Sequence, residues 1–200
     1  MPDLYYTIIY ELADGTTIRL MMIDTQVHCD RIGSDRPYPY FAPQSAADDQ
    51  LTWLTNELDK SDSFDWNFVV GHYQLQDPAG GNDIKFEGCM DNIDSLLQNY
   101  PVTAYINGHE HYISHLESVA KPGFHYITSG WAHIAQKVPD GPNDAVINHF
   151  SYSRSLAAAG GFAAFRINRN EVNMDFWVSS YDSDEAMYSA DLAKKANMLV

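Results

Sequence analysis

The sequence predicts one mixed domain of the α+β or α/β class that spans residues 1–200. Apolar residues make up 45% of the chain, which supports a sizeable core and argues against intrinsic disorder. Two short apolar stretches, Trp66–Val70 and Thr103–Ile106, flank a helical pattern. That order is typical of a βαβ unit with parallel strands. Alternating stretches near the C-terminus predict antiparallel strands in addition.

The first third of the chain predicts a hairpin and a helix. Leu4–Tyr10 and Thr17–Ile23 are rich in β-forming residues, and the Asp-Gly pair between them is a strong hairpin signal. Pro43–Leu58 has the pattern of a helix, because three leucines fall on one face and Ser45 can cap its start. Between them, Arg31–Pro43 has the composition of a loop.

The rest of the chain predicts a crossover helix, a final helix, four strands and two less regular segments. Gln74–Lys85 has the composition of a mobile loop, and Glu87–Gln98 that of the crossover helix. Trp131–Ala159 lacks a pattern and predicts a long functional or disordered loop. Asp184–Asn197 predicts a final amphipathic helix. The predicted strands are Ser114–Ala120, Phe124–Thr128, Gly161–Asn168 and Val172–Ser179.

The most informative pattern is a Gly-His pair after each strand of the βαβ unit. His72 follows Gly71, and His109 and His111 follow Gly108. The carboxyl ends of adjacent parallel strands meet at one edge of a sheet, so these imidazoles should lie close together. Imidazole is the commonest metal ligand in proteins, and without soft ligands zinc or iron fits best. The His-x-His spacing suits two metals or two sides of one.

The other polar residues give weaker signals. Asp24 at a strand end is expected to cap a turn rather than bind a metal. We interpret the remaining histidines as surface or loop residues, with two of them in the long loop facing a substrate as the alternative. These histidines are His28, His115, His125, His133 and His149. Residues that could contact a substrate are Tyr73, Asn107, His133 and Asn148.

Composition and missing motifs exclude several other functions. The formal net charge of −15 would repel nucleic acid and anionic lipid. No apolar run is long enough to cross a membrane, and no signal peptide is visible. Nucleophile-elbow, P-loop and HExxH motifs are absent. The two cysteines, Cys29 and Cys89, form either one disulfide or two buried thiols, and without a CxxC pair they do not predict a zinc finger.

Together these residues resemble the C-terminal part of a purple acid phosphatase of the small tartrate-resistant type, within the calcineurin-like metallophosphoesterase superfamily. The resemblance runs through most of the chain, and the order of the segments is more specific than any one of them. The matching segments are Met1–Tyr6, Met22–Thr25, Gln50–Leu54, Val70–Tyr73, Gly108–His111, Ser129-Gly130, Val138–Gly141 and Gly160–Ala163.

The resemblance implies a fold and a chemistry. The fold would be part of a four-layer α/β/β/α sandwich with mixed sheets. The site would be a dinuclear metal centre that pairs ferric iron with iron, zinc or manganese. His72 and His109 would bind the second metal and His111 the iron. A metal-activated hydroxide would then hydrolyse small phosphate monoesters or phosphoproteins. Family members are secreted, lysosomal or vacuolar.

The sequence also departs from the family pattern. The motifs Gly-Asp-x-Gly, Gly-Asp-x-x-Tyr and Gly-Asn-His-Asp do not occur, and their place would be upstream of Met1. They supply the remaining metal ligands and the acid/base histidine, so no catalytic residue is assigned here. We therefore expect a chain with the N-terminal half missing, exposed strand edges and little activity alone. In the second histidine motif, Glu110 stands where the family has Asp.

The resemblance bears on the cysteines as well, because the small purple acid phosphatases have a disulfide at these positions. It implies that Cys29 and Cys89 are paired, which would contribute roughly 4 kcal/mol in the chain-entropy model.

Two alternatives to a phosphatase stay open. One is a non-catalytic remnant of the fold that binds a metal or a partner protein. The other is a calcineurin-like phosphoesterase that acts on diesters, which the Tyr5-Tyr6 and Val138–Gly141 segments disfavour.

Overall fold

The computed structural model describes residues 4–29, 44–79, 89–131, 136–153, 160–179 and 185–194. The predicted loop Arg31–Pro43, most of the second half of Gln74–Lys85, and His133 lie outside these ranges. The described elements are β1 (Tyr6–Glu11), β2 (Thr17–Met22), α1 (Gln26–Cys29), α2 (Gln44–Leu58), a 3-10 turn (Ser61–Ser63), β3 (Trp66–Val70), α3 (Asp91–Leu97), β4 (Ala104–Asn107), β5 (Ile113–Ser118), β6 (His125–Ser129), β7 (Val146–Tyr152), β8 (Gly161–Ile167), β9 (Glu171–Val178) and β10 (Tyr188–Lys194).

Ten strands form two sheets in the described part of the chain. The larger sheet has the order β1-β2-β3-β4-β6-β5-β7, and its four central strands β2, β3, β4 and β6 are parallel. The predicted hairpin forms its first edge, and antiparallel β5 and β7 form the other. The smaller sheet, β10-β9-β8, is antiparallel throughout. The expected mixed α/β architecture with a βαβ unit is thus confirmed.

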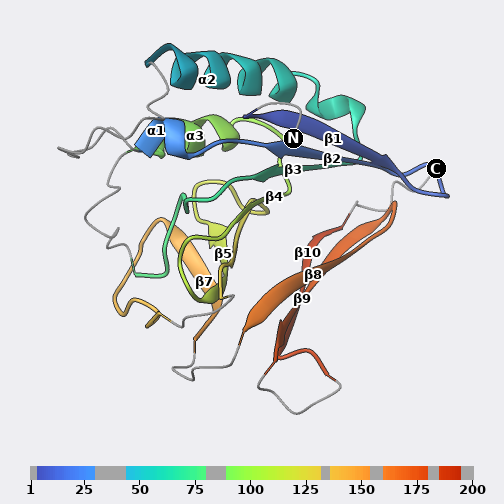
Figure 1. The fold of residues 1–200 in the computed structure, drawn as a ribbon. Coiled ribbons are helices and arrows are strands. Elements are labelled where there is room, and N and C mark those ends of the chain that lie inside the picture. The colour runs from blue at the N-terminus through green and yellow to red at the C-terminus, as the bar shows by residue number, and fades with distance from the viewer. Residues whose placement is uncertain are drawn as a thin grey trace.

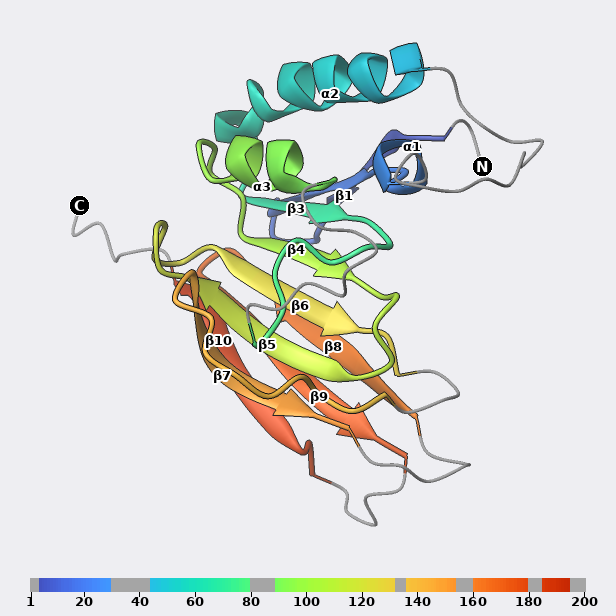
Figure 2. The same cartoon turned by 90° about the vertical axis from the view of Figure 1, so that its left-hand side faces the viewer.

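The larger sheet is covered on both faces over its central strands, so β3, β4 and β6 are largely buried on both sides. Helices α1, α2 and α3 lie along one face, and the smaller sheet lies against the other (Figures 1 and 2). Consecutive residues of β3 show the alternation, because Val69 packs with the helices and Phe68 packs with the smaller sheet. This is the geometry expected for two layers that share one central sheet.

One buried cation ties the helical layer to the sheet. The side chain of Arg19 in β2 is fully buried. Its guanidinium donates to Asn67 Oδ1 at 2.9 Å, to the carbonyl of Glu57 at 2.6 Å and to Ser61 Oγ at 2.9 Å. It also lies 4.5 Å from the ring centroid of Phe64. Three acceptors and the nearby carboxylate of Glu57, 3.7 Å from Nη1, therefore offset the cost of burying this cation.

Two predictions of secondary structure were wrong. The stretch Trp131–Ala159 contains β7, an edge strand that pairs with β5. The predicted helix Asp184–Asn197 contains β10 instead, which pairs with β9 through a register shift between Asp191 and Ala193. In both cases tertiary pairing decided the structure, since the local patterns were weak or favoured helix.

The disulfide between Cys29 and Cys89 is present, with an S–S distance of 1.98 Å. It joins the last residue of α1 to the turn that precedes α3. Cys29 is 2% exposed and belongs to the core beneath α2. The pairing that the resemblance implied is therefore confirmed.

The free edge of β1 carries exposed apolar residues, as the sequence led us to expect. Ile9 is 56% exposed and Tyr10 is 52% exposed, although they point to opposite faces of the strand.

Among the helices of the described ranges, none combines the length and the apolar character that crossing a bilayer requires.

Candidate functional site

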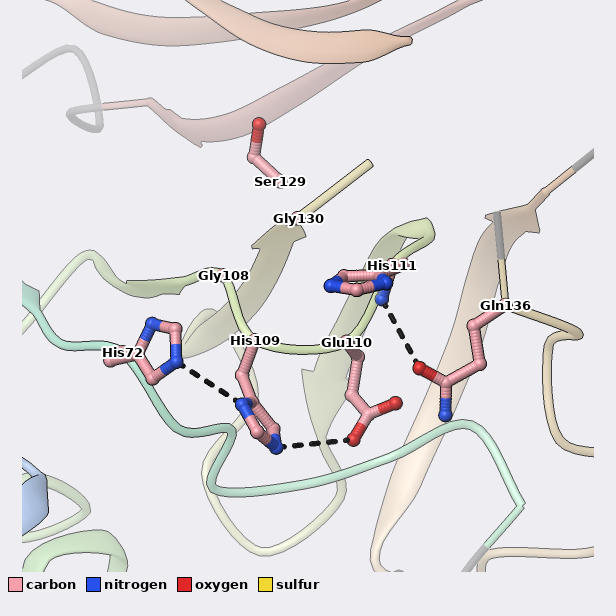
Figure 3. Close-up of a pocket in the computed structure, with 8 residues that line it drawn as sticks. All are labelled: His72, Gly108, His109, Glu110, His111, Ser129, Gly130 and Gln136. Carbon is pink, nitrogen blue, oxygen red and sulfur yellow. Dashed lines mark hydrogen bonds and ion pairs between the residues drawn. The ribbon is translucent and has the colours of Figure 1, made fainter. Parts of the chain in front are cut away.

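A pocket of about 450 Å³ opens at the carboxyl ends of three adjacent parallel strands (Figure 3). His72 follows β3, the segment from Gly108 follows β4, and Ser129 ends β6. Ligand sites of open α/β sheets lie at this edge. All three predicted histidines reach the pocket. It is lined by His72, Gly108, His109, Glu110, His111, Ser129, Gly130 and Gln136.

The backbone around the pocket is tightly packed, and two glycines are required by contact. A Cβ on Gly71 would lie 2.3 Å from the hydroxyl oxygen of Tyr105. A Cβ on Gly130 would lie 2.0 Å from the carbonyl oxygen of Glu110. At Gly108, by contrast, a Cβ would make only an ordinary contact at 3.9 Å. The close approach therefore occurs between the end of β6 and the loop after β4.

His109 has the one left-handed backbone of a non-glycine residue in the described part of the chain, with φ of 59°. This conformation costs about 1–2 kcal/mol for a residue with a Cβ. Such strain is concentrated at functional sites, where the surrounding structure holds the residue in place. Here the hydrogen bonds from Gly108 N to the carbonyl of His72 and from Glu110 N to the carbonyl of Gly108 fix the turn.

His72 and His109 lie in contact across the two strand ends. Their ring nitrogens, Nε2 of His72 and Nδ1 of His109, are 3.1 Å apart. Tyr73 buttresses the pair, because its ring centroid lies 4.6 Å from that of His109. Tyr73 is itself fixed by its backbone N–H, which donates to Thr25 Oγ1, and by its carbonyl, which accepts from the hydroxyl of Tyr105 at 2.6 Å.

His111 lines the same pocket but lies apart from the other two imidazoles, beside Gln136 (Figure 3). Two hydrogen bonds connect the segments, one from His111 N to Gln136 Oε1 at 3.4 Å and one from Gln136 N to the carbonyl of His111 at 3.0 Å. His111 therefore has a fixed backbone and an exposed ring. The rings of His109 and His111 thus lie at different parts of the pocket, which is compatible with the expectation that a His-x-His pair suits two metals or two sides of one.

A buried carboxylate lies between the histidines. Glu110 is 4% exposed, and its Oε1 lies 3.9 Å from Nε2 of His109. The hydroxyl of Tyr112 is buried nearby without a hydrogen-bond partner among the described residues. Burial raises the pKa of this phenol, and the charges of Glu110 and Asp77 raise it further. In the part of the chain that the structure describes, Glu110 is thus the one carboxylate that lines the pocket.

The pocket meets part of the requirement for a metal. In the described ranges, no three His, Cys, Asp or Glu side chains lie close enough to hold one ion. The ring nitrogens of His72 and His109 are at hydrogen-bond distance, and the same separation is also compatible with two ligands of one ion. With metal–nitrogen bonds of about 2.1 Å, two ligands lie about 2.9 to 3.4 Å apart, and the observed separation is 3.1 Å. The three-histidine metal site itself stays a prediction.

The other candidate residues lie outside the pocket. Asp24 accepts from the backbone N–H of Gln26, which is the expected turn cap. Tyr73 and Asn107 are buried, and Asn107 bonds internally to Gly108 and Thr128. Asn148 and His149 belong to β7 and do not line the pocket. These positions therefore offer no substrate contact in this structure.

The interpretation of two further histidines was wrong. His115 and His125 are 3% and 4% exposed, whereas we expected surface or loop residues. They lie on strands that are covered on both faces. In such strands a polar residue at an alternate position does not indicate a side chain that faces solvent. The sequence also gave no signal for Gln136, because its segment has no regular pattern and reaches the pocket only through its contact with His111.

Comparison with known proteins agrees with this architecture. No family model matches the chain. Tartrate-resistant acid phosphatase type 5 of Rattus norvegicus is 27% identical over 189 residues, which cover 88% of this chain and 53% of the relative. The chain thus spans about half the length of the relatives it matches.

Two solved structures share the fold. One is described as GAP50, the anchor in the inner membrane complex of Plasmodium. It has a TM-score of 0.70 at 20% identity, and the match covers 98% of this chain and 56% of that one. The other is the purple acid phosphatase PPD1 from yellow lupin, with a TM-score of 0.64 at 15% identity over 94% of this chain and 32% of that one. The sequence similarity, at low identity, and the shared fold support a relationship of this chain to the metallophosphoesterase family that includes the tartrate-resistant and purple acid phosphatases.

Proposed function

We propose that this chain carries the histidine half of a dinuclear metal site for phosphate monoester hydrolysis. The observation that supports the proposal is the juxtaposition of His72 and His109, whose ring nitrogens are 3.1 Å apart at the carboxyl ends of adjacent parallel strands. His111 lines the same pocket on its other side. The similarity to acid phosphatases over most of the chain supports phosphate ester chemistry for this pocket.

The residues of the chain would have separate roles. His72 and His109 would hold one metal ion and His111 a second, and metal ions in such a site polarise phosphoryl oxygens and lower the pKa of bound water. Glu110 lies 3.9 Å from the second ring nitrogen of His109 and would orient that ring. Gln136 fixes the backbone of His111. Ser129 and Gly130 form the wall at the end of β6, where a phosphate would enter.

The chain does not supply a full set of ligands for two metals. Three imidazoles leave most positions of a dinuclear centre to other donors, and the Asp, Tyr and Asn motifs of the family do not occur here. We therefore expect metal binding from this chain but little turnover of a phosphate monoester. A second half, supplied by the same polypeptide or by a partner, would complete the site. The disulfide fits an oxidising compartment, such as the secretory or lysosomal route of the family.

The test is calorimetric titration of the 200-residue chain with Zn²⁺, which reads out metal binding without requiring catalysis. We expect saturable binding that is lost in His72→Gln and His109→Gln. The matched control is His149→Gln, which removes an imidazole outside the pocket and should leave binding unchanged. Absence of zinc binding, or equal binding by all four proteins, would exclude the proposed site. Hydrolysis of an aryl phosphate at a high, metal-dependent rate would contradict our view that the chain alone is incomplete.

A second candidate is a non-catalytic binding protein built on the same fold. One observation favours it, namely the TM-score of 0.70 to a protein described as an anchor in a membrane complex. A chain with this role needs its fold but has no need of the imidazole pair. A folded protein that binds no zinc and hydrolyses no phosphate ester would favour this candidate over the first.

A further inference from the structure

A second group of histidines lies between the two sheets, away from the pocket. His115 of β5 and His125 of β6 are 3% and 4% exposed and face the smaller sheet. The group also contains Tyr188 and the carbonyl of Leu192, both from β10. We call these four groups the inter-sheet cluster.

The members of the inter-sheet cluster are connected in one line. The hydroxyl of Tyr188 lies 2.9 Å from Nδ1 of His115. Nε2 of His115 lies 3.0 Å from Nδ1 of His125. Nε2 of His125 lies 2.7 Å from the carbonyl oxygen of Leu192. The line therefore begins and ends on β10 and passes through the larger sheet.

Hydrogen-bond chemistry permits a single proton arrangement when both rings are neutral. The carbonyl of Leu192 only accepts, so Nε2 of His125 must carry a proton and its Nδ1 must accept. Nε2 of His115 is then the donor, and its Nδ1 accepts from the hydroxyl of Tyr188. Every bond is satisfied in this order. An added proton does not by itself break this line, because the Tyr188 hydroxyl can accept from Nδ1 of His115 as well as donate to it. The cost of protonation is therefore the burial of a charge between the two sheets.

The surroundings keep both rings neutral. Burial lowers the pKa of His115 to about 3, and the positive charges that His125 and His149 can carry lower it further. Burial likewise lowers the pKa of His125, against the raising effects of the Leu192 carbonyl and of Glu117. Glu117 pairs with His149 at 2.8 Å at the rim of the group. The other neighbours of Tyr188 are the rings of Phe150 and Phe176, which carry no charge.

The position of β10 makes this line of bonds important. Among the strands of the described ranges, β10 is an edge strand of the smaller sheet and pairs with β9 alone. Its residues Tyr188 and Leu192 provide the polar contacts described above to the larger sheet, while the Phe150 ring stacks on Tyr188 at 4.5 Å. Edge elements with few such contacts are the first to open in local unfolding.

We propose that the inter-sheet cluster is an acid-sensitive contact: protonation of His115 or His125 would bury a charge between the two sheets, so acid favours the release of β10 from the larger sheet before the remainder of the chain unfolds. The released strand exposes both rings to water, where a histidine has its ordinary pKa of about 6.5. The ratio of open to closed molecules then rises up to tenfold per pH unit below about 6.5 for each histidine, and up to about a hundredfold for both. This inference does not depend on the proposed metal site.

Hydrogen exchange followed by NMR on the full 200-residue chain tests it between pH 7 and pH 5. Protection factors, corrected for the intrinsic exchange rate at each pH, should fall by up to about a hundredfold per pH unit for the amides of β10. The amides of β4 and β6 should keep theirs. Constant protection of β10 would overturn the inference. So would an equal loss in all strands, because that result means global unfolding.

Three variants separate the roles within the cluster. His125→Gln keeps a donor for the Leu192 carbonyl but cannot titrate, so the pH dependence for β10 should fall to about tenfold per unit. Tyr188→Phe should lower the protection factors of the β10 amides at every pH, but the change of these factors per pH unit should stay as in the unaltered chain. The control His28→Gln, in α1 on the other face of the larger sheet, should retain the pH dependence of the unaltered chain. An unaltered slope in His125→Gln would contradict the proposed role of that ring.

Discussion

Removing the Cys29–Cys89 disulfide should lower the free energy of unfolding by about 4 kcal/mol. The two cysteines are 60 positions apart in the sequence, so the bond closes a long loop in the unfolded chain. In the chain-entropy model, a loop of this length corresponds to about 14 cal/mol/K, or about 4 kcal/mol at 25 °C. For a domain of this size, the melting temperature should fall by about 8–16 °C.

Urea unfolding of the oxidised chain, of the chain reduced with dithiothreitol, and of three alanine variants measures this loss. Cys29→Ala and Cys89→Ala should each cost nearly as much as the double variant, because either one removes the same bond. Such non-additivity distinguishes a disulfide from two independent buried thiols. The reasoning is refuted if the double variant unfolds within about 1 kcal/mol of the oxidised chain. Two reactive thiols in the denatured, unreduced protein would refute it as well.

Three further substitutions test the packing, each by urea unfolding. Gly71→Ala should cost about 1–3 kcal/mol, because its Cβ would lie 2.3 Å from the Tyr105 hydroxyl, and adding Tyr105→Phe should recover part of that loss. Arg19→Ala should cost about 3–5 kcal/mol, since its buried acceptors lose their donor; a loss below about 1 kcal/mol would show that water replaces the guanidinium. Leu54→Ala should cost about 2–5 kcal/mol, whereas the exposed control Ile9→Ala should stay within about 0.5 kcal/mol. Equal effects of the last two would contradict the described core.

The parts of the fold that the sequence predicted well are those with strong local patterns. The Asp-Gly turn predicted the first hairpin, and the spacing of leucines predicted α2 to within a residue at its start. The apolar stretches before each Gly-His pair predicted β3 and β4 and their parallel pairing. From that pairing the position of the pocket followed, because parallel strands bring their carboxyl ends to one edge.

The parts that the sequence did not predict depend on contacts between distant residues. β7 has β-forming residues but lies within a stretch rich in Pro, Gly and Asn, so its pairing with β5 has no local signal. β10 contains Ala, Leu and Lys, which favour helix, yet pairing with β9 and contact with His115 and His125 hold it extended. The burial of those two histidines and the position of Gln136 follow from the same non-local contacts.

The backbone of His109 bears on the choice between an enzyme and a passive remnant. Glycine or asparagine would adopt its φ of 59° at lower cost, so exchanging the histidine should make the isolated fold more stable. A protein that did not use this imidazole would become more stable if glycine or asparagine replaced the histidine. Histidine is nevertheless present at position 109, as expected if selection has kept it for metal binding at the expense of stability.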